Sequence, residues 1–166
     1  KMQGNIVDML YAPLSALEVS FAIIFAAITR SLVIAIISII VFSMIIDIQF
    51  YNILYVFIFG FLSSFILGSL GFITGLWAEK YDHTATIINF VITPLSFLSG
   101  VFYSIDKLPT IFKNISLLNP FFYMIDGFRY GFLGVADGSI KFGLIYLTII
   151  SITIWLVAFY LFKIGY

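Results

Sequence analysis

The 166-residue sequence contains no cysteine, a single histidine and few charged residues. Without cysteine, these residues can form no disulfide, no thiolate nucleophile and no cysteine-based metal centre. Charged residues make up 10% of the chain, whereas soluble domains average about 25%. The formal net charge is zero, which excludes nucleic-acid binding through a basic surface.

Apolar residues are present in large excess. They make up 63% of the chain, and the mean hydropathy is +1.18. Four long runs with few or no charges approach or exceed the ~20 residues with which a helix crosses a ~30 Å hydrocarbon core. A lone spanning strand would leave its backbone groups unpaired in lipid. We therefore predict an all-α polytopic membrane protein with spans at residues 20–46, 52–78, 84–104 and 142–163.

The segment between the third and fourth predicted spans is apolar but broken by polar residues. Its nine leucine, isoleucine, valine and phenylalanine residues between Leu117 and Ala136 would gain about 3–5 kcal/mol on insertion. Asp126 and Arg129 would each cost about 2.5–3.5 kcal/mol at the bilayer centre. We therefore predict a re-entrant hairpin at residues 108–136, which turns back in the outer leaflet without crossing.

The first 18 residues are more polar than the rest. The stretch around Gly4 and Pro13 is helix-sized and amphipathic, and it is too short and polar to span a bilayer. Its apolar residues include Ile6, Met9, Leu10 and Leu14. We predict an amphipathic surface segment at residues 1–18, followed by a transmembrane domain at residues 19–166.

Charged side chains in or near the apolar segments are the first candidates for function. Asp126 and Arg129 are three residues apart, so on a helix they share a face and can pair. Two interpretations stay open: a structural ion pair, the usual fate of such charges, or an outer gate. Arg30 is interpreted as lying near the inner boundary of the first span, from where its long side chain reaches water or a neighbouring helix.

Small residues recur at steps of three or four along the second predicted span. They are Gly60, Ser64, Gly68, Gly71 and Gly75. Small side chains let another helix approach closely, so we interpret these residues as a helix-packing face. The partner helix is either internal or from a second copy of the chain.

No pattern in the sequence predicts catalysis. The pattern Glu79, Asp82 and His83 is a weak signal for a metal site, and a solvated turn explains it better. The 166 residues contain no phosphate-binding loop of the form G-x-x-x-x-G-K-[ST]. They also show no nucleophile–base pair within a span.

Two stretches, in their order along the sequence, resemble the ABC type-2 transporter permease family, the membrane subunits of ATP-driven exporters. NIVDMLYAPLSALEV is similar to the cytoplasmic coupling segment of that family. PLSFLSGVFYSIDKLP, followed by LLNPFFYMIDGFRYGFLG, is similar to the family signature before the last span. The first stretch departs from the family pattern, because Asn5–Asp8 has no glutamate directly before its apolar pair.

The resemblance implies partners and an orientation. The implied partners are a cytoplasmic ABC ATPase subunit that binds ATP and Mg²⁺, a second permease copy and membrane lipid, with no cofactor in this chain and no nucleic acid. The implied ATPase-coupling residues are Ile6, Met9, Leu10, Pro13 and Leu14. The resemblance also places an amphipathic elbow and two spans before Lys1, the N-terminal segment in the cytoplasm and the hairpin outside. The positive-inside count favours the opposite orientation by one charge, and we follow the longer signature.

These observations together predict a non-enzymatic permease subunit of an ABC exporter in the bacterial plasma (inner) membrane. Its substrate would be a drug, lipid or glycan moved outward. The alternatives are a secondary transporter or channel subunit without an ATPase, and a membrane assembly protein that transports nothing.

Overall fold

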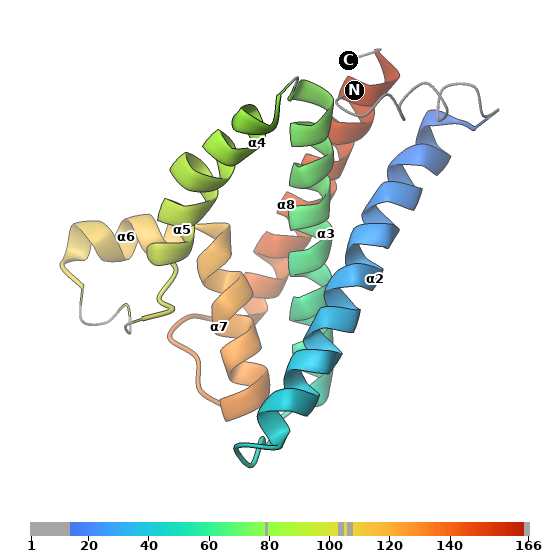
Figure 1. The fold of residues 1–166 in the computed structure, drawn as a ribbon. Helices are drawn as coiled ribbons and strands as arrows, with labels where there is room; N and C mark the ends of the chain where they lie inside the picture. The colour runs from blue at the N-terminus through green and yellow to red at the C-terminus, as the bar shows by residue number, and fades with distance from the viewer. Residues whose placement is uncertain (1–13, 79, 103–104, 106–107, 165–166) are drawn as a thin grey trace.

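The computed structural model describes residues 14–78, 80–102, 105 and 108–164, and its long regular elements are all helices (Figure 1). Three helices are long and apolar enough to cross a membrane: α2 (Ala16–Ser43), α3 (Ile53–Trp77) and α8 (Ile140–Lys163). At ~1.5 Å per residue each is roughly 36–42 Å long, which exceeds the ~30 Å hydrocarbon core. The predicted all-α class is confirmed, and three of the four predicted spans correspond to these helices.

Polar side chains fix where the long helices begin. Ser15 and Glu18 form a capping box at the start of α2. The Glu18 backbone N–H donates to Ser15 Oγ (3.3 Å), and the Ser15 backbone N–H donates to Glu18 Oε2 (2.7 Å). Asn52 and Ser139 accept first-turn N–H groups of α3 and α8 in the same way. Each bond satisfies a donor that a helix leaves free at its N-terminus.

The third predicted span, residues 84–104, does not form a helix of membrane-spanning length. A continuous helical segment runs through α4 (Tyr81–Ile87), the π-helical turn η1 (Ile88–Ile92) and α5 (Thr93–Phe97). Its length is about 25 Å at ~1.5 Å per residue. The segment ends seven residues before the predicted boundary, and Gly100, with φ +76°, lies in the turn that follows.

Pro94 accounts for the π-helical turn. Proline has no N–H to donate into a helix, so the regular hydrogen-bond ladder is interrupted there. Thr93, directly before it, donates its backbone N–H to the carbonyl of Ile88, five residues back. The Thr93 hydroxyl donates to the same carbonyl at 2.9 Å. The wide turn is thus stabilised by two donors from one residue.

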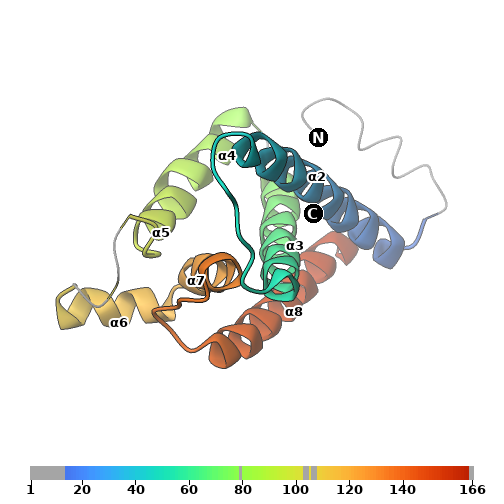
Figure 2. The same cartoon turned by 90° about the horizontal axis from the view of Figure 1, so that it is seen from below.

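The predicted hairpin, residues 108–136, contains two helices, α6 (Thr110–Leu118) and α7 (Pro120–Leu133), and α6 lies across α7 instead of packing along it (Figures 1 and 2). We keep the name hairpin for this segment. Asn119 stands at the bend: its side chain accepts the Phe121 N–H (3.0 Å) and donates to the Leu95 carbonyl of α5 (2.6 Å). Pro120 begins α7, where a missing N–H costs nothing.

The two ends of the hairpin lie close together. Before it, the Ile105 N–H donates to Asp137 Oδ2, which follows the hairpin, at 3.3 Å. Two ends that lie this close together are what a segment that turns back on itself would have. Its position relative to a bilayer stays a prediction, as does the complete four-span layout.

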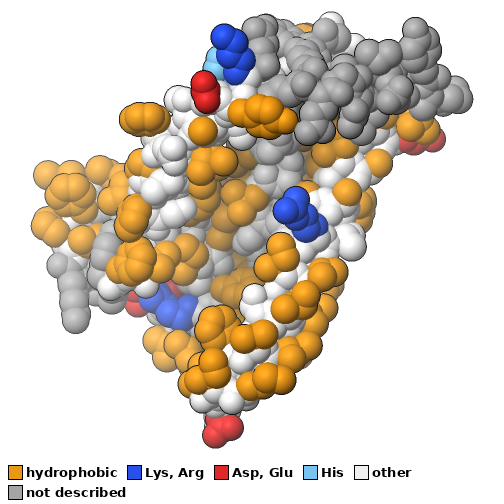
Figure 3. Space-filling view, viewed as in Figure 1, with side chains coloured by type: hydrophobic (Ala, Val, Ile, Leu, Met, Phe, Trp, Pro, Cys, Tyr) orange, Lys and Arg blue, Asp and Glu red, His pale blue; other side chains and the backbone are white. Residues whose placement is uncertain are grey.

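The helix α3 is central to the bundle. Seen from the side and from below, α2, α7 and α8 lie around it (Figures 1 and 2). The main core lies between α3, α7 and α8 and includes Phe59, Ile66, Phe122 and Leu147, all buried. Hydrophobic side chains also cover the outer face (Figure 3), as expected of a surface in contact with lipid or with other helices.

The connections divide between two ends of the bundle. The start of α2, the α3–α4 connection and the end of α8 lie at one end (Figure 1). The α2–α3 and α7–α8 connections lie at the other end (Figure 1). This arrangement agrees with an even number of crossings between the first and last described residues.

Two glycines allow α7 to lie directly against α3. A Cβ atom built at Gly131 would lie 2.8 Å from the Val56 backbone nitrogen. One built at Gly127 would lie 2.2 Å from the Phe59 ring. Because a backbone atom cannot move aside as a side chain can, Gly131 is the more restrictive position.

We expect Gly131→Ala to destabilise the fold by about 1–3 kcal/mol, because the added methyl group overpacks the α3–α7 contact. Gly71→Ala is the matched control, since a Cβ there meets no atom within 4 Å in the described structure. The control should be neutral or stabilising by up to about 1 kcal/mol, owing to the higher helix propensity of alanine. Thermal unfolding of the detergent-solubilised variants measures both, and equal midpoints would contradict the proposed contact.

The arrangement of the connections also predicts labelling from opposite sides of the membrane. Because these 166 residues contain no cysteine, single cysteines at Ser139 and Ile164, both exposed, can be labelled with a membrane-impermeant maleimide in a permease without other cysteines. We expect one to react in intact cells and the other only after permeabilisation. A cysteine at the exposed Asn114 of α6 should behave like Ser139→Cys. Reaction of Asn114→Cys from the side of Ile164→Cys would show that the hairpin crosses the membrane.

Candidate functional site

The predicted pair Asp126 and Arg129 belongs to a larger ion-pair network. Both lie on α7, and Arg129 Nη2 contacts Asp126 Oδ1. The same nitrogen lies 2.9 Å from Oδ2 of Asp137, in the α7–α8 connection. The Asp126 carboxylate also accepts the backbone N–H groups of Asp137 and Gly138, each at 2.9 Å. The network ties the end of the hairpin to the start of α8.

Burial makes this network costly to disrupt. Asp126 is only 2% exposed, and a buried charge without partners loses several kcal/mol of solvation. Burial lowers the pKa of Arg129, but hydrogen bonds to Asp126 and Asp137 and their negative charges outweigh it, and the net shift is upward. Arg129 is therefore charged. Its Nε is buried and has no hydrogen-bond partner among the described residues.

The geometry favours the structural interpretation of this pair. Both oxygens of Asp126 are occupied by Arg129 and by backbone N–H groups, so the carboxylate has little capacity left for a substrate. Sequence reasoning missed Asp137, because it lies beyond the end of α7 at Leu133, in a connection where helical spacing does not predict which side chains meet. The sequence does contain one indication of its importance: Asp137 lies directly before Gly138 and Ser139, where the next span begins.

Leu14 is the only one of the five predicted coupling residues within the described ranges. It is 53% exposed and directly precedes Ser15, the N-cap of α2. The other four, Ile6, Met9, Leu10 and Pro13, lie outside the described residues. An exposed leucine at the end of the bundle is compatible with a contact surface, and the coupling role stays a prediction.

The small residues of α3 face more than one neighbour. Gly60 lies against α7: a Cβ atom built there would be 3.0 Å from the nearest side-chain carbon of that helix. Gly68 lies against α2, where the corresponding distance is 3.1 Å. The hydroxyls of Ser64 and of Ser31 on α2 are hydrogen-bonded at 2.6 Å. A Cβ at Gly71 or Gly75 meets no atom within 4 Å in the described structure.

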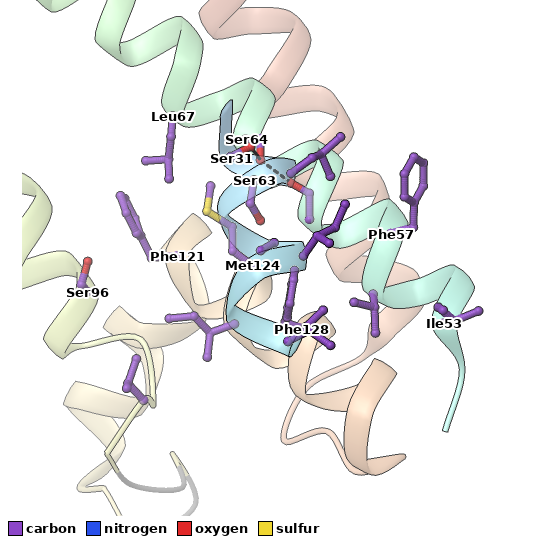
Figure 4. A pocket seen from close by; sticks show the side chains of 18 of the residues that line it. Ser31, Ile53, Phe57, Ser63, Ser64, Leu67, Ser96, Phe121, Met124 and Phe128 are labelled. Carbon is purple, nitrogen blue, oxygen red and sulfur yellow. Dashed lines mark hydrogen bonds between the residues drawn. The ribbon is translucent and has the colours of Figure 1, made fainter. Parts of the chain in front are cut away.

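An apolar groove opens between α2, α3, α7 and the η1–α5 segment (Figure 4). Its volume is about 810 Å³, and α3 lines it from Ile53 to Leu67. Phe121, Met124 and Phe128 of α7 form another side. Among the residues that the structure describes, no charged side chain lines the groove.

Arg30 lies midway along α2 and is exposed. About 20 Å of helix separates Arg30 from Ser43, where α2 ends. The predicted position of Arg30 near the inner boundary of the span stays a prediction.

The weak metal pattern is only partly within the described ranges. Asp82 and His83 lie on α4, and the His83 ring contacts Trp77. Glu79 lies outside the described residues. Within those residues, no three potential histidine or carboxylate ligands come together.

We expect Asp126→Ala to destabilise the protein by about 3–5 kcal/mol, because it removes the main partner of a partly buried guanidinium and leaves two backbone N–H groups unpaired. Asp82→Ala, at an exposed position of α4, is the matched control and should stay within about 0.5 kcal/mol of the parent. Thermal unfolding in detergent distinguishes them. A parental midpoint for Asp126→Ala would show that the network contributes nothing to stability.

Comparison with known proteins identifies the family. Residues 1–133 match the family model described as ABC-2 type transporter. The chain is 32% identical over 163 residues to the inner membrane transport permease YadH of Escherichia coli K12, covering 97% of this chain and 61% of YadH. It is 33% identical over 84 residues to nodulation protein J of Rhizobium leguminosarum bv. viciae, covering 49% of this chain and 32% of that protein. No solved structure matches. The chain, which spans about three-fifths of the length of YadH, belongs to the ABC-2 type transporter family.

Proposed function

We propose that this chain is the main membrane-spanning part of an exporter permease that is driven by a separate ABC ATPase in a bacterial inner membrane. The observation that carries the proposal is the family match over residues 1–133. It is supported by three apolar helices of membrane-spanning length and by YadH, which is named an inner membrane transport permease. The protein is then a transport subunit and not an enzyme.

The energy source would lie in a partner. The 166 residues contain no phosphate-binding loop, so ATP and Mg²⁺ would be held by the ATPase subunit. Two permease copies, or two related chains, would enclose the path for a substrate that the fold does not identify. Closure of the ATPases would shift the permease helices between inward-open and outward-open states.

The proposed orientation puts the end of the bundle with Leu14 and the end of α8 in the cytoplasm. The ATPase would contact the N-terminal segment at this end, where Leu14 is 53% exposed. The α6–α7 hairpin and the Asp126–Arg129–Asp137 network would then lie toward the outer surface. The network would hold the hairpin in place on that side during the cycle.

The proposal predicts that replacing apolar coupling residues uncouples transport from ATP hydrolysis. In the full-length permease with its ATPase, we expect Leu10→Asp combined with Leu14→Asp to reduce transport-linked ATPase activity about tenfold, which corresponds to about 1.4 kcal/mol of lost contact energy. The spans should remain folded, because Leu14 lies outside the core.

Val135→Asp is the control for this experiment. Val135 is 62% exposed in the α7–α8 connection at the opposite end of the bundle, so this variant should retain coupled activity. Retained coupling in the Leu10→Asp, Leu14→Asp variant would argue against the assigned contact. Failure of the parent permease to co-purify with any ATPase would instead favour a secondary transporter or an assembly protein.

A further inference from the structure

We propose that Arg30 of α2 binds the phosphate group of a membrane phospholipid. The lipid would belong to the leaflet at the Ala16 end of α2, which is the cytoplasmic leaflet in the proposed orientation. The phosphate contact rests on α2 as a membrane-spanning helix and on the surroundings of Arg30, and it does not depend on coupling to an ATPase.

The first argument is the position of Arg30 along α2. The helix runs from Ala16 to Ser43, so about 20 Å of it extends on either side of Arg30 at ~1.5 Å per residue. Arg30 is the only charged residue of α2 after its first turn. Because α2 is long and apolar enough to cross a membrane, a charge in this position needs a partner.

The described residues provide no such partner. Among them, no hydrogen bond or ion pair of the Arg30 side chain is found, whereas Arg129 pairs with two aspartates. The one carboxylate of α2, Glu18, lies about 18 Å along the helix and is hydrogen-bonded to Ser15 in the capping box. The five N–H donors of Arg30 are therefore available to a group outside the described residues.

Arg30 also faces away from the apolar groove. The groove-lining residues of α2 are Ser31, Leu32, Ala35, Ile36 and Ile39. At about 100° per residue, Arg30 projects about 180° from Ile39 and at least ~100° from the other four. Arg30 itself is exposed. Whatever fills the groove therefore leaves the guanidinium group on the opposite face of the helix.

The direction of the side chain and the space beside it favour a lipid headgroup. Side chains of an α-helix point toward its N-terminus, so Arg30 reaches toward the Ala16 end. Ala26 and Ala22 lie four and eight residues earlier on the same face, and both are exposed. Their small side chains leave room for a phosphate that enters from this end.

The same face of α2 is apolar beyond Arg30, toward Ser43. Val33, Ile34, Ile37 and Val41 are each about half-exposed there. A lipid whose phosphate contacts Arg30 would lay its acyl chains over these residues, so one molecule satisfies both the charge and the apolar surface. The planar guanidinium also matches phosphate oxygens with two parallel hydrogen bonds. A free anion would satisfy only the charge and would lose its hydration.

Native mass spectrometry of the full-length permease in detergent tests the proposal, with phosphatidylglycerol as the probe. We expect Arg30→Gln to bind its tightest lipid about tenfold more weakly than the parent. Arg30→Lys, which keeps the charge but loses the planar fork, should be intermediate. Lys163→Gln, at an exposed position in the last turn of α8, is the matched control for general attraction between lysine or arginine and anionic lipid, and it should bind like the parent. Equal affinities of the parent and Arg30→Gln would overturn the proposal.

Two further ligands identify the chemical group that is bound. Dioleoylglycerol has acyl chains without phosphate, and inorganic phosphate has the anion without acyl chains. We expect neither to raise the thermal unfolding midpoint of the parent as dioleoylphosphatidylglycerol does. An equal rise with inorganic phosphate would show a site for a soluble anion, and an equal rise with dioleoylglycerol would show a purely apolar site. Either result would overturn the proposal.

A carboxylate elsewhere in the full-length permease is the competing partner for Arg30. If a phospholipid is the partner, the parent and Arg30→Gln should unfold at the same midpoint in lipid-free detergent. Only the rise that phosphatidylglycerol causes should be lost in the variant. A lower midpoint of Arg30→Gln without lipid, or its failure to fold, would show that Arg30 pairs within the protein and would overturn the proposal.

Discussion

The structure depends on one constraint: in hydrocarbon, every polar group must find its partner within the protein. In the long helices the backbone N–H and C=O groups pair with each other, and side-chain hydroxyls pair with carbonyls of the same helix. Ser38, Ser69 and Thr153 each donate to the carbonyl four residues earlier, at 2.8 Å. Serine and threonine can therefore lie within apolar spans without creating polar surface, and α3 carries no charged residue at all.

The hairpin satisfies the same constraint through its contacts with α3. The N–H groups of Tyr51 and Asn52, at the start of α3, donate to the carbonyls of Phe132 and Gly131, at the end of α7, at 3.2 and 2.9 Å. Free donors at one helix start thus meet free acceptors at another helix end, where the partial charges are also opposite. Gly131 makes this approach possible, and the Asp126 network closes the connection behind it.

The long helices could be predicted well, because a long stretch with few or no charged residues strongly indicates a membrane-spanning helix. The predicted boundaries of the three membrane-length helices differ from the observed ones by at most four residues. Pro94 and Gly100 interrupt the remaining apolar stretch, which the sequence analysis predicts as a span at residues 84–104. The π-helical turn depends on how Thr93 shares the Ile88 carbonyl, which residue spacing does not reveal. The four-residue spacing of Gly127 and Gly131 also indicates close helix packing, but the interpretation of this segment considered only the charges of Asp126 and Arg129.

The distribution of charge also bears on how transport would be powered. Transporters coupled to ions or protons carry charged or titratable residues near the middle of their spans. In α8 the charged residues are Lys141 and Lys163, at its two ends, and in α2 they are Glu18 in the first turn and Arg30. Within the described spans α2, α3 and α8, Arg30 is thus the one charged residue that lies near the middle of a helix.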